Sequence, residues 1–238
     1  STAYLLYLLV IFPVSFNAVR QLAAMSMVFL SVSLLYKRKN IAAIVPFIVA
    51  TLMHKSSLIL AIFLPIILLF IHKTTFKFRE IFSMFVIGVV VLLSGSVVFS
   101  TFMQSSILSD YSQYASTSNA AAGSILILKI VIFSVFLAFT IMGKLQKLEY
   151  SRLFVVMSFL EIAMLVIGLS SVDISRFAMY FSVFSLLLIP SVTESFTRQA
   201  QRPILLLVLL YGLAMFFIQY FILKGSDIFP YQSIFGGF

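Results

Sequence analysis

The sequence contains no cysteine and only two histidines. Without cysteine the chain can form neither a disulfide nor a thiolate nucleophile, and two histidines alone argue against a structural zinc site. Charge is also scarce, since charged residues make up 10% of the chain, whereas a soluble domain carries about 25%. Phosphate-binding loops, dinucleotide-binding glycine motifs, zinc-protease motifs and the Gly-x-Ser-x-Gly motif are absent. We therefore expect neither a metal nor a cofactor.

Apolar residues dominate the composition of the chain. They make up 62% of the chain, and the mean hydropathy is +1.17. The apolar runs are continuous rather than alternating, which favours helices over a β-barrel. The sequence therefore predicts an all-α polytopic membrane protein, a single domain over residues 1–238 with about nine transmembrane or partly re-entrant helices. The predicted segments lie near 1–16, 18–36, 41–54, 56–72, 81–101, 124–142, 153–169, 174–192 and 203–223.

Four of the predicted connectors are basic. They span 37–39, 73–79, 143–152 and 193–203, and they hold 11 of the 16 lysines and arginines. Basic connectors of a membrane protein usually face the cytoplasm, so the net charge of +9 is better explained by membrane orientation than by nucleic-acid binding. The polar loop 102–123 and the aromatic tail 224–238 then lie on the outer side.

The stretch "ATLMHKSSLI" (50–59) interrupts the apolar run from Ile41 to Ile71. A single helix over this run would be about 46 Å long, whereas the hydrocarbon core of a bilayer is about 30 Å thick. A single crossing would also place two basic connectors on opposite sides of the membrane. We therefore predict that the chain reverses at His54-Lys55, at the outer face.

This topology brings further polar residues to the outer face. Arg20 offers a planar fork of donors suited to phosphate, although it could also snorkel to the interface, and Gln21 adds a second polar group. His54 could act as a general base or as a phosphate donor, or could be a buried turn residue. Lys55 could bind substrate or anchor the chain at the interface.

The stretch from Asp173 to Tyr180 is the richest polar motif. Asp173 suits a helix cap, Arg176 could pair with it, and Tyr180 lies one turn beyond Arg176 on the same face. Glu161 is the only acid near mid-membrane, which suggests either function or a hydrogen-bonded packing residue. In the outer loop, Asp110 and Tyr114 suit contacts to sugars, or simply an exposed loop.

Four stretches together resemble the EpsG family, which belongs to the wider class of Wzy-type exopolysaccharide and O-antigen polymerases. "NAVRQLAA" (17–24) resembles the family stretch N-x-x-R-Q-x-x-A. "IVATLMHKSSLI" (48–59), which includes Ser56, is similar to A-x-x-x-H-x-S-x-x-I. "SRFAMYFSVFSLLLIP" (175–190) resembles the R-x-x-x-Y-F helix, and "DIFPYQSIF" (227–235), with Tyr231, resembles the Pro-Tyr-rich tail. Family members usually have further spans before the R-Q helix, so we expect the chain to lack an N-terminal part.

The resemblance implies a membrane glycosyltransferase-type polysaccharide polymerase at the outer face of the bacterial cytoplasmic membrane. Its substrate would be oligosaccharide repeat units carried on polyprenyl diphosphate. An acceptor hydroxyl would attack the anomeric carbon of the donor glycan, and polyprenyl diphosphate would leave. Partners would be the lipid bilayer and chain-length regulator or flippase proteins, with no nucleic acid.

The expected site residues fall into two groups. Catalytic roles are expected for His54, Arg20, Arg176 and Asp173, with His54 preferred over Asp173 as the base. Substrate-binding roles are expected for Gln21, Lys55, Ser56, Asp110, Tyr114, Glu161, Tyr180 and Tyr231. The alternatives are a lipid-linked sugar flippase or transporter, or a related glycan ligase or membrane O-acyltransferase.

Overall fold

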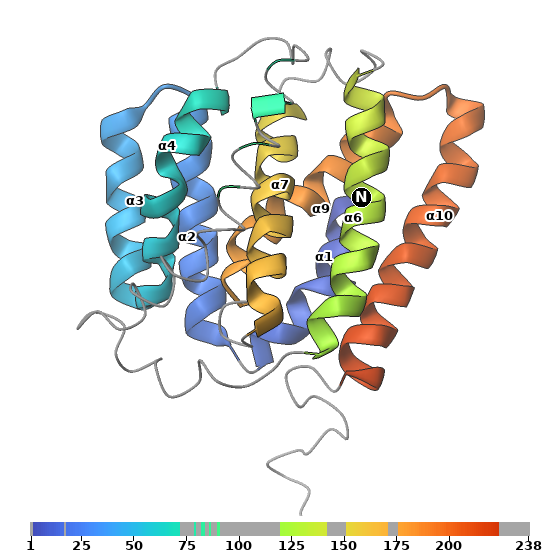
Figure 1. Ribbon diagram of the computed structural model, residues 1–238, viewed down its shortest axis with the longest axis horizontal. Helices are drawn as coiled ribbons and strands as arrows, with labels where there is room; N and C mark the ends of the chain where they lie inside the picture. Colours follow the sequence, from blue (N-terminus) through green and yellow to red (C-terminus); the bar gives the residue numbers. More distant parts are fainter. Residues whose placement is uncertain are drawn as a thin grey trace, which may run out of the picture.

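The computed structural model describes residues 2–16, 18–71, 120–141, 151–170 and 176–223, with isolated positions between 79 and 90. In these ranges all regular structure is helical, which confirms the predicted all-α class, and Figure 1 shows the helices side by side. The eight α-helices are α1 (Thr2–Val10), α2 (Val19–Tyr36), α3 (Asn40–Met53), α4 (Ile59–Ile71), α6 (Ala120–Ile141), α7 (Ser151–Ile167), α9 (Met179–Glu194) and α10 (Arg198–Phe216). Short 3₁₀ turns are η1 (Phe12–Phe16), η2 (Lys55–Leu58) and η4 (Gly168–Ser170), and the π-helical segment η5 (Phe217–Ile222) continues α10.

The length and composition of two helical segments suit a membrane crossing. They are Val19–Tyr36 and Arg198–Ile222, and five shorter apolar helices accompany them. Large apolar side chains are also exposed on the surface of the bundle. Ile41 and Leu52 of α3 are 84% and 82% exposed, and Leu207 of α10 is 65% exposed. The predicted count of nine spans stays a prediction, because most of segment 81–101, residues 102–119 of the loop and the tail 224–238 lie outside the described residues.

The predicted segments that fall in the described residues match the helices closely, with two instructive differences. The first predicted segment, 1–16, divides, because α1 ends at Val10 and the chain continues as η1 around Pro13. Proline has no backbone N–H for the helical ladder and restricts the residue before it, which favours a break here, although Pro46, Pro65 and Pro190 lie inside helices. Conversely, α10 begins at Arg198, inside the predicted connector 193–203. The basic residues at this point therefore lie within the start of the helix and not in a connector before it.

The chain reverses between α3 and α4, as predicted. Figure 1 shows α3 descending and α4 rising beside it, so that the turn after α2 and the far end of α4 lie at one end of the bundle. The starts of α2 and α9 lie at the other end, near η2. The reversal therefore gathers three chain segments, distant in sequence, at one end of the molecule.

A tight turn joins α2 to α3. Arg38 has φ of 58°, in the left-handed region that glycine usually occupies. Its N–H donates to the Leu35 carbonyl, and the Lys39 N–H donates to the Leu34 carbonyl, each at 2.9 Å. This is the Schellman pattern that ends a helix and satisfies its last carbonyls. The two helices are then joined by Ser31, whose buried hydroxyl donates to the Ala43 carbonyl at 2.8 Å.

Helix α9 forms the centre of the bundle. Phe181 makes an edge-to-face contact with Phe63 of α4, with ring centroids 5.6 Å apart. The ring centroids of Phe184 and of Phe29 in α2 are 5.0 Å apart. Helix α7 also packs along α9. Because several helices cover it, α9 is buried over most of its surface, and the residues at its start are held firmly in place.

Helices α1 and α10 close one side of the bundle. Gly212 of α10 lies so close to α1 that a Cβ there would approach Leu9 Cδ1 to 3.0 Å. The buried Tyr220 hydroxyl donates to the Val10 carbonyl at 2.7 Å. This bond satisfies a carbonyl at the end of α1, where no further helical turn supplies a donor.

Replacing Tyr220 with Phe is expected to lower the free energy of unfolding by about 1 kcal/mol, because the Val10 carbonyl loses its donor while the ring still fills its space. Thermal unfolding in detergent micelles would measure the change. Tyr4→Phe is the matched control, since Tyr4 is 63% exposed. Equal stabilities of the Tyr220 and Tyr4 variants would contradict this role for the bond.

Candidate functional site

The first turn of α2 contributes two polar residues to the end of the bundle. Arg20 is exposed, whereas Gln21 is buried at 5% exposure. The Gln21 side-chain amide donates to the backbone carbonyl of Arg176 at 3.1 Å. This bond ties the start of α2 to the segment just before α9. It therefore sets where Arg176 stands relative to Arg20.

The break between α3 and α4 contributes His54. Its backbone is extended, with φ −156° and ψ 115°. The His54 N–H still donates to the Ala50 carbonyl at 2.9 Å, and the His54 carbonyl accepts from the Ser57 N–H at 3.0 Å. The buried Ser57 hydroxyl also donates to Thr51 Oγ1 at 3.3 Å. The break thus retains backbone hydrogen bonds without glycine or proline, which gives His54 a fixed position.

A chain of three side chains leads from His54 into the bundle. His54 Nδ1 lies 2.5 Å from Ser56 Oγ, and Ser56 Oγ lies 2.8 Å from the Tyr180 hydroxyl. Ser56 and Tyr180 are 4% and 1% exposed, whereas His54 is half-buried. The outer member of this chain therefore meets the surface, and its inner members anchor it to α9.

Both arginines act electrostatically on His54. The pKa of His54 lies below its ordinary value, first because the ring is partly buried, and then because the positive charges of Arg20 and Arg176 oppose protonation. The imidazole is accordingly neutral at neutral pH. The two guanidinium groups and one imidazole come from three separate segments, and together they form a concentration of donors suited to an anion.

The remaining predicted residues lie in several places. Lys55 is exposed at the start of η2, beside His54. Asp173, Asp110, Tyr114 and Tyr231 fall outside the described residues. Within the described part of the chain, no group of three or more His, Cys, Asp or Glu side chains is arranged to hold a metal ion.

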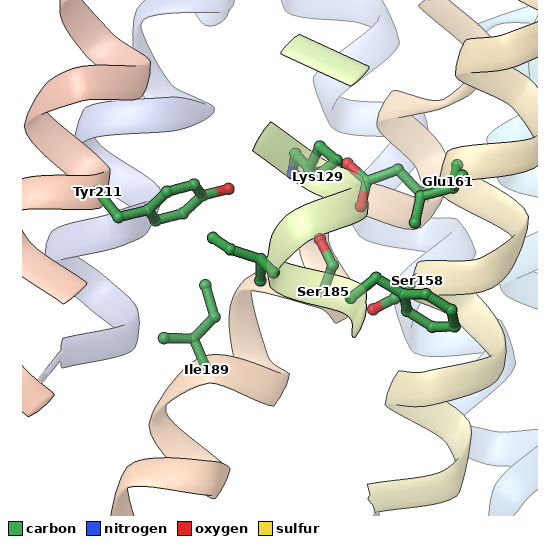
Figure 2. Close-up of a pocket in the computed structure, with 9 residues that line it drawn as sticks. Lys129, Ser158, Glu161, Ser185, Ile189 and Tyr211 are labelled. Carbon is green, nitrogen blue, oxygen red and sulfur yellow. Dashed lines mark ion pairs between the residues drawn. The ribbon is translucent and has the colours of Figure 1, made fainter. Parts of the chain in front are cut away.

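Glu161 belongs to a second polar cluster, deep between α6, α7 and α10. Its carboxylate forms an ion pair with Lys129 Nζ at 2.8 Å, and the two side chains are 4% and 7% exposed. The Tyr211 hydroxyl points toward the pair in Figure 2. A cavity of about 10 Å³ beside the pair is lined by Ser158 and Ser185, among others. Such a space holds about one water molecule.

Sequence reasoning identified Glu161 but missed its partners. A signal for Lys129 was present, because a lone lysine inside the apolar run 124–142 must either reach the interface or find a counter-charge. Among the predicted spans, Glu161 was the only acid able to supply one. No comparable signal marked Tyr211, one of ten tyrosines.

Comparison with known protein families matches residues 1–233 to the EpsG family. The chain belongs to the EpsG family. This family is associated with exopolysaccharide biosynthesis. Searches of curated proteins and of solved structures find no match. The EpsG family assignment covers every segment that builds the end of the bundle around His54.

Removing either arginine is expected to raise the pKa of His54, because one opposing positive charge disappears. Arg20→Gln and Arg176→Gln would each be titrated by ¹⁵N NMR of histidine-labelled protein carrying His72→Gln, which leaves His54 as the only histidine. Lys37→Gln, at the opposite end of α2, is the control and should leave the titration unchanged. Unshifted titrations in both arginine variants would contradict this electrostatic coupling.

Glu161→Gln is expected to destabilise the fold by about 3 kcal/mol, since Lys129 would keep a buried charge without its partner. The double variant Glu161→Gln, Lys129→Met removes both charges and should recover most of the loss. Unfolding in denaturant with intact detergent micelles would measure both. A double variant no more stable than Glu161→Gln would show that the charge imbalance is not the cause.

Proposed function

We propose that this EpsG-family chain polymerises oligosaccharide repeat units, carried on polyprenyl diphosphate, at the outer face of the bacterial cytoplasmic membrane. The observation that supports this most directly is the convergence of Arg20 and Arg176 on His54 at one end of the bundle. In the proposed reaction the leaving group is a lipid diphosphate. A pair of guanidinium groups suits that leaving group.

The charge distribution supports an outward-facing site. Lys37, Arg38 and Lys39 lie at the end of α2 opposite Arg20, about 25 Å away along the helix. Arg198 and Arg202 begin α10 at this same basic end, away from η2. By the bias of basic residues toward the cytoplasm, this end faces inward. Arg20, His54 and Arg176 then face outward.

The apolar surfaces support a membrane setting for the whole bundle. The outer faces of α3 and α10 expose large aliphatic side chains that suit lipid tails better than water. The shorter helices would cross tilted, or would reach the outer face as a re-entrant pair, which is the arrangement we propose for α3 and α4. On this basis we retain about nine spans, one of them near 81–101.

The chemistry requires charge stabilisation at the leaving group. A hydroxyl oxygen of the acceptor sugar forms a bond to the anomeric carbon of the donor glycan. The bond from that carbon to the diphosphate oxygen breaks, and its electron pair stays with polyprenyl diphosphate. A base takes the hydroxyl proton. Fixed cations next to the diphosphate lower the barrier, because they stabilise the charge as it develops.

The second polar cluster gives little support to a transport function. A transported sugar would need a continuous polar path through the bundle. The deep charges of the described residues, Lys129 and Glu161, are paired with each other, and the space beside them holds about one water molecule. We therefore place the substrate at the exposed end of the bundle.

Replacing Arg20 or Arg176 with Ala is expected to abolish long-chain polymer while the protein still inserts normally, because the leaving diphosphate loses a bidentate partner. The variants would be expressed in a strain lacking the wild-type chain, and polymer length would be read on gels. Arg202→Ala, at the basic end, is the matched control and should keep full-length polymer.

The same strains separate polymerisation from transport. A polymerase defect leaves single lipid-linked repeat units exposed on the outer face, whereas a flippase defect leaves them on the inner face. Full-length polymer from both arginine variants would overturn the proposed function.

A further inference from the structure

The turn between α2 and α3 carries three consecutive basic side chains, Lys37, Arg38 and Lys39, and all three are exposed. Neither acidic residue in the described part of the chain, Glu161 or Glu194, forms an ion pair with them. These two carboxylates therefore leave the positive charge of the turn unneutralised. Such a concentration of exposed charge attracts an anion from outside the bundle.

Arginine occupies the centre of this turn although the backbone there favours glycine. Arg38 has φ of 58°, a conformation that glycine adopts more readily than any residue with a Cβ atom. The two hydrogen bonds that close the turn use the backbone N–H groups of Arg38 and Lys39, and glycine would form them equally well. An unfavourable conformation that persists at a charged residue points to a role for its side chain.

An apolar surface begins at the turn and runs along α3. One side of the helix packs along α2, where Ala43 and Ala50 are buried, and Figure 1 shows α3 at one edge of the bundle. The other side exposes a stripe of large aliphatic side chains, which we call the α3 apolar stripe: Ile41, Ile44, Val45, Ile48 and Leu52. From its first residue to its last the stripe is about 16 Å long. This length matches one leaflet of a hydrocarbon core about 30 Å thick.

We propose that the turn Lys37–Lys39 and the α3 apolar stripe together bind an anionic phospholipid, with the phosphate at the basic side chains and an acyl chain along α3. Basic residues at a membrane surface attract anionic headgroups over a short range. An acidic protein segment would match the charge alone, whereas a phospholipid matches both the charge and the adjoining apolar stripe. The inference does not depend on the proposed function, because this turn and Arg20 lie at opposite ends of α2.

A second group of basic residues at the same end of the bundle offers an internal comparison. Arg198 and Arg202 are exposed in the first turns of α10, and Figure 1 shows α10 at the opposite edge of the bundle from α3. These arginines contribute to the overall charge of this end but lie away from the α3 apolar stripe. They therefore distinguish a site at the turn from a general attraction of the basic end.

The sequence contains no tryptophan, so an introduced tryptophan reports its own lipid neighbours. Val45→Trp places it in the α3 apolar stripe, at a position that is 63% exposed. The purified variant would be reconstituted in phosphatidylcholine vesicles containing either brominated phosphatidylglycerol or brominated phosphatidylcholine, since bromine quenches tryptophan fluorescence at close range. We expect phosphatidylglycerol to occupy the stripe about tenfold more readily. Equal quenching by the two lipids would overturn the proposal, and would leave an acidic protein as the partner of the turn.

Two matched variants carry the same tryptophan. Replacing all three basic residues of the turn with Gln should abolish the preference for phosphatidylglycerol. Arg198→Gln combined with Arg202→Gln should retain it, because these residues lie outside the proposed site. Similar losses in both variants would contradict a site at the turn and show a general attraction instead.

Arg38→Gly separates lipid binding from folding. Glycine adopts the backbone conformation of this position readily, so the variant should unfold at a temperature no lower than the chain with Arg38. Its preference for phosphatidylglycerol should nevertheless fall about threefold, because one of the three charges is lost. Circular dichroism in detergent micelles and the quenching assay would measure the two effects. A lower unfolding temperature, or an undiminished lipid preference, would contradict the role assigned to Arg38.

Discussion

The reversal at His54 is the constraint from which the site follows. Between α3 and α4 the helical hydrogen bonds must be interrupted in apolar surroundings, where water is scarce and an unmet backbone group is costly. Ala50, Ser57 and Thr51 supply the bonds that hold this break. A well-held break fixes η2, and η2 directs Ser56 toward Tyr180 while His54 stays at the end of the bundle. Arg20 joins them because α2 begins at the same end as η2.

The gathered positive charge has an energetic consequence. Partial burial of the His54 ring lowers its pKa, and the two guanidinium groups oppose its protonation further. On the proposed function, a diphosphate beside the arginines would offset their charge. The positive charge near His54 therefore favours an anion over a cation at this end of the bundle. On the proposed function, these cations would stabilise the further negative charge that develops on the diphosphate as it leaves.

The sequence predicted much of the fold because hydropathy and charge are properties of single positions. The bounds of α2 and α3, and the break at His54, followed from run length and from keeping basic connectors on one side. The same reasoning placed Arg20, His54 and Arg176 at one depth. It could not predict that Gln21 bonds to the Arg176 backbone or that Lys129 pairs with Glu161. The first contact joins residues more than a hundred positions apart in the sequence, and the second joins residues about thirty positions apart. Both depend on how the helices are rotated and packed against one another.

Helix α9 separates the two polar systems of the molecule. Tyr180 and Ser185 are five residues apart, which places them about 7.5 Å apart along the axis and about 140° apart around it. Tyr180 is linked through Ser56 to His54, at the end of the bundle where Arg20 is exposed, whereas Ser185 lines the cavity beside the buried Lys129–Glu161 pair. On the proposed function, a ligand would bind at the first system, where Arg20 is exposed. The buried pair instead joins α6 to α7, with Tyr211 of α10 beside it. Since α7 packs against α9, the pair stabilises the packing that holds α9, and therefore Tyr180, in place.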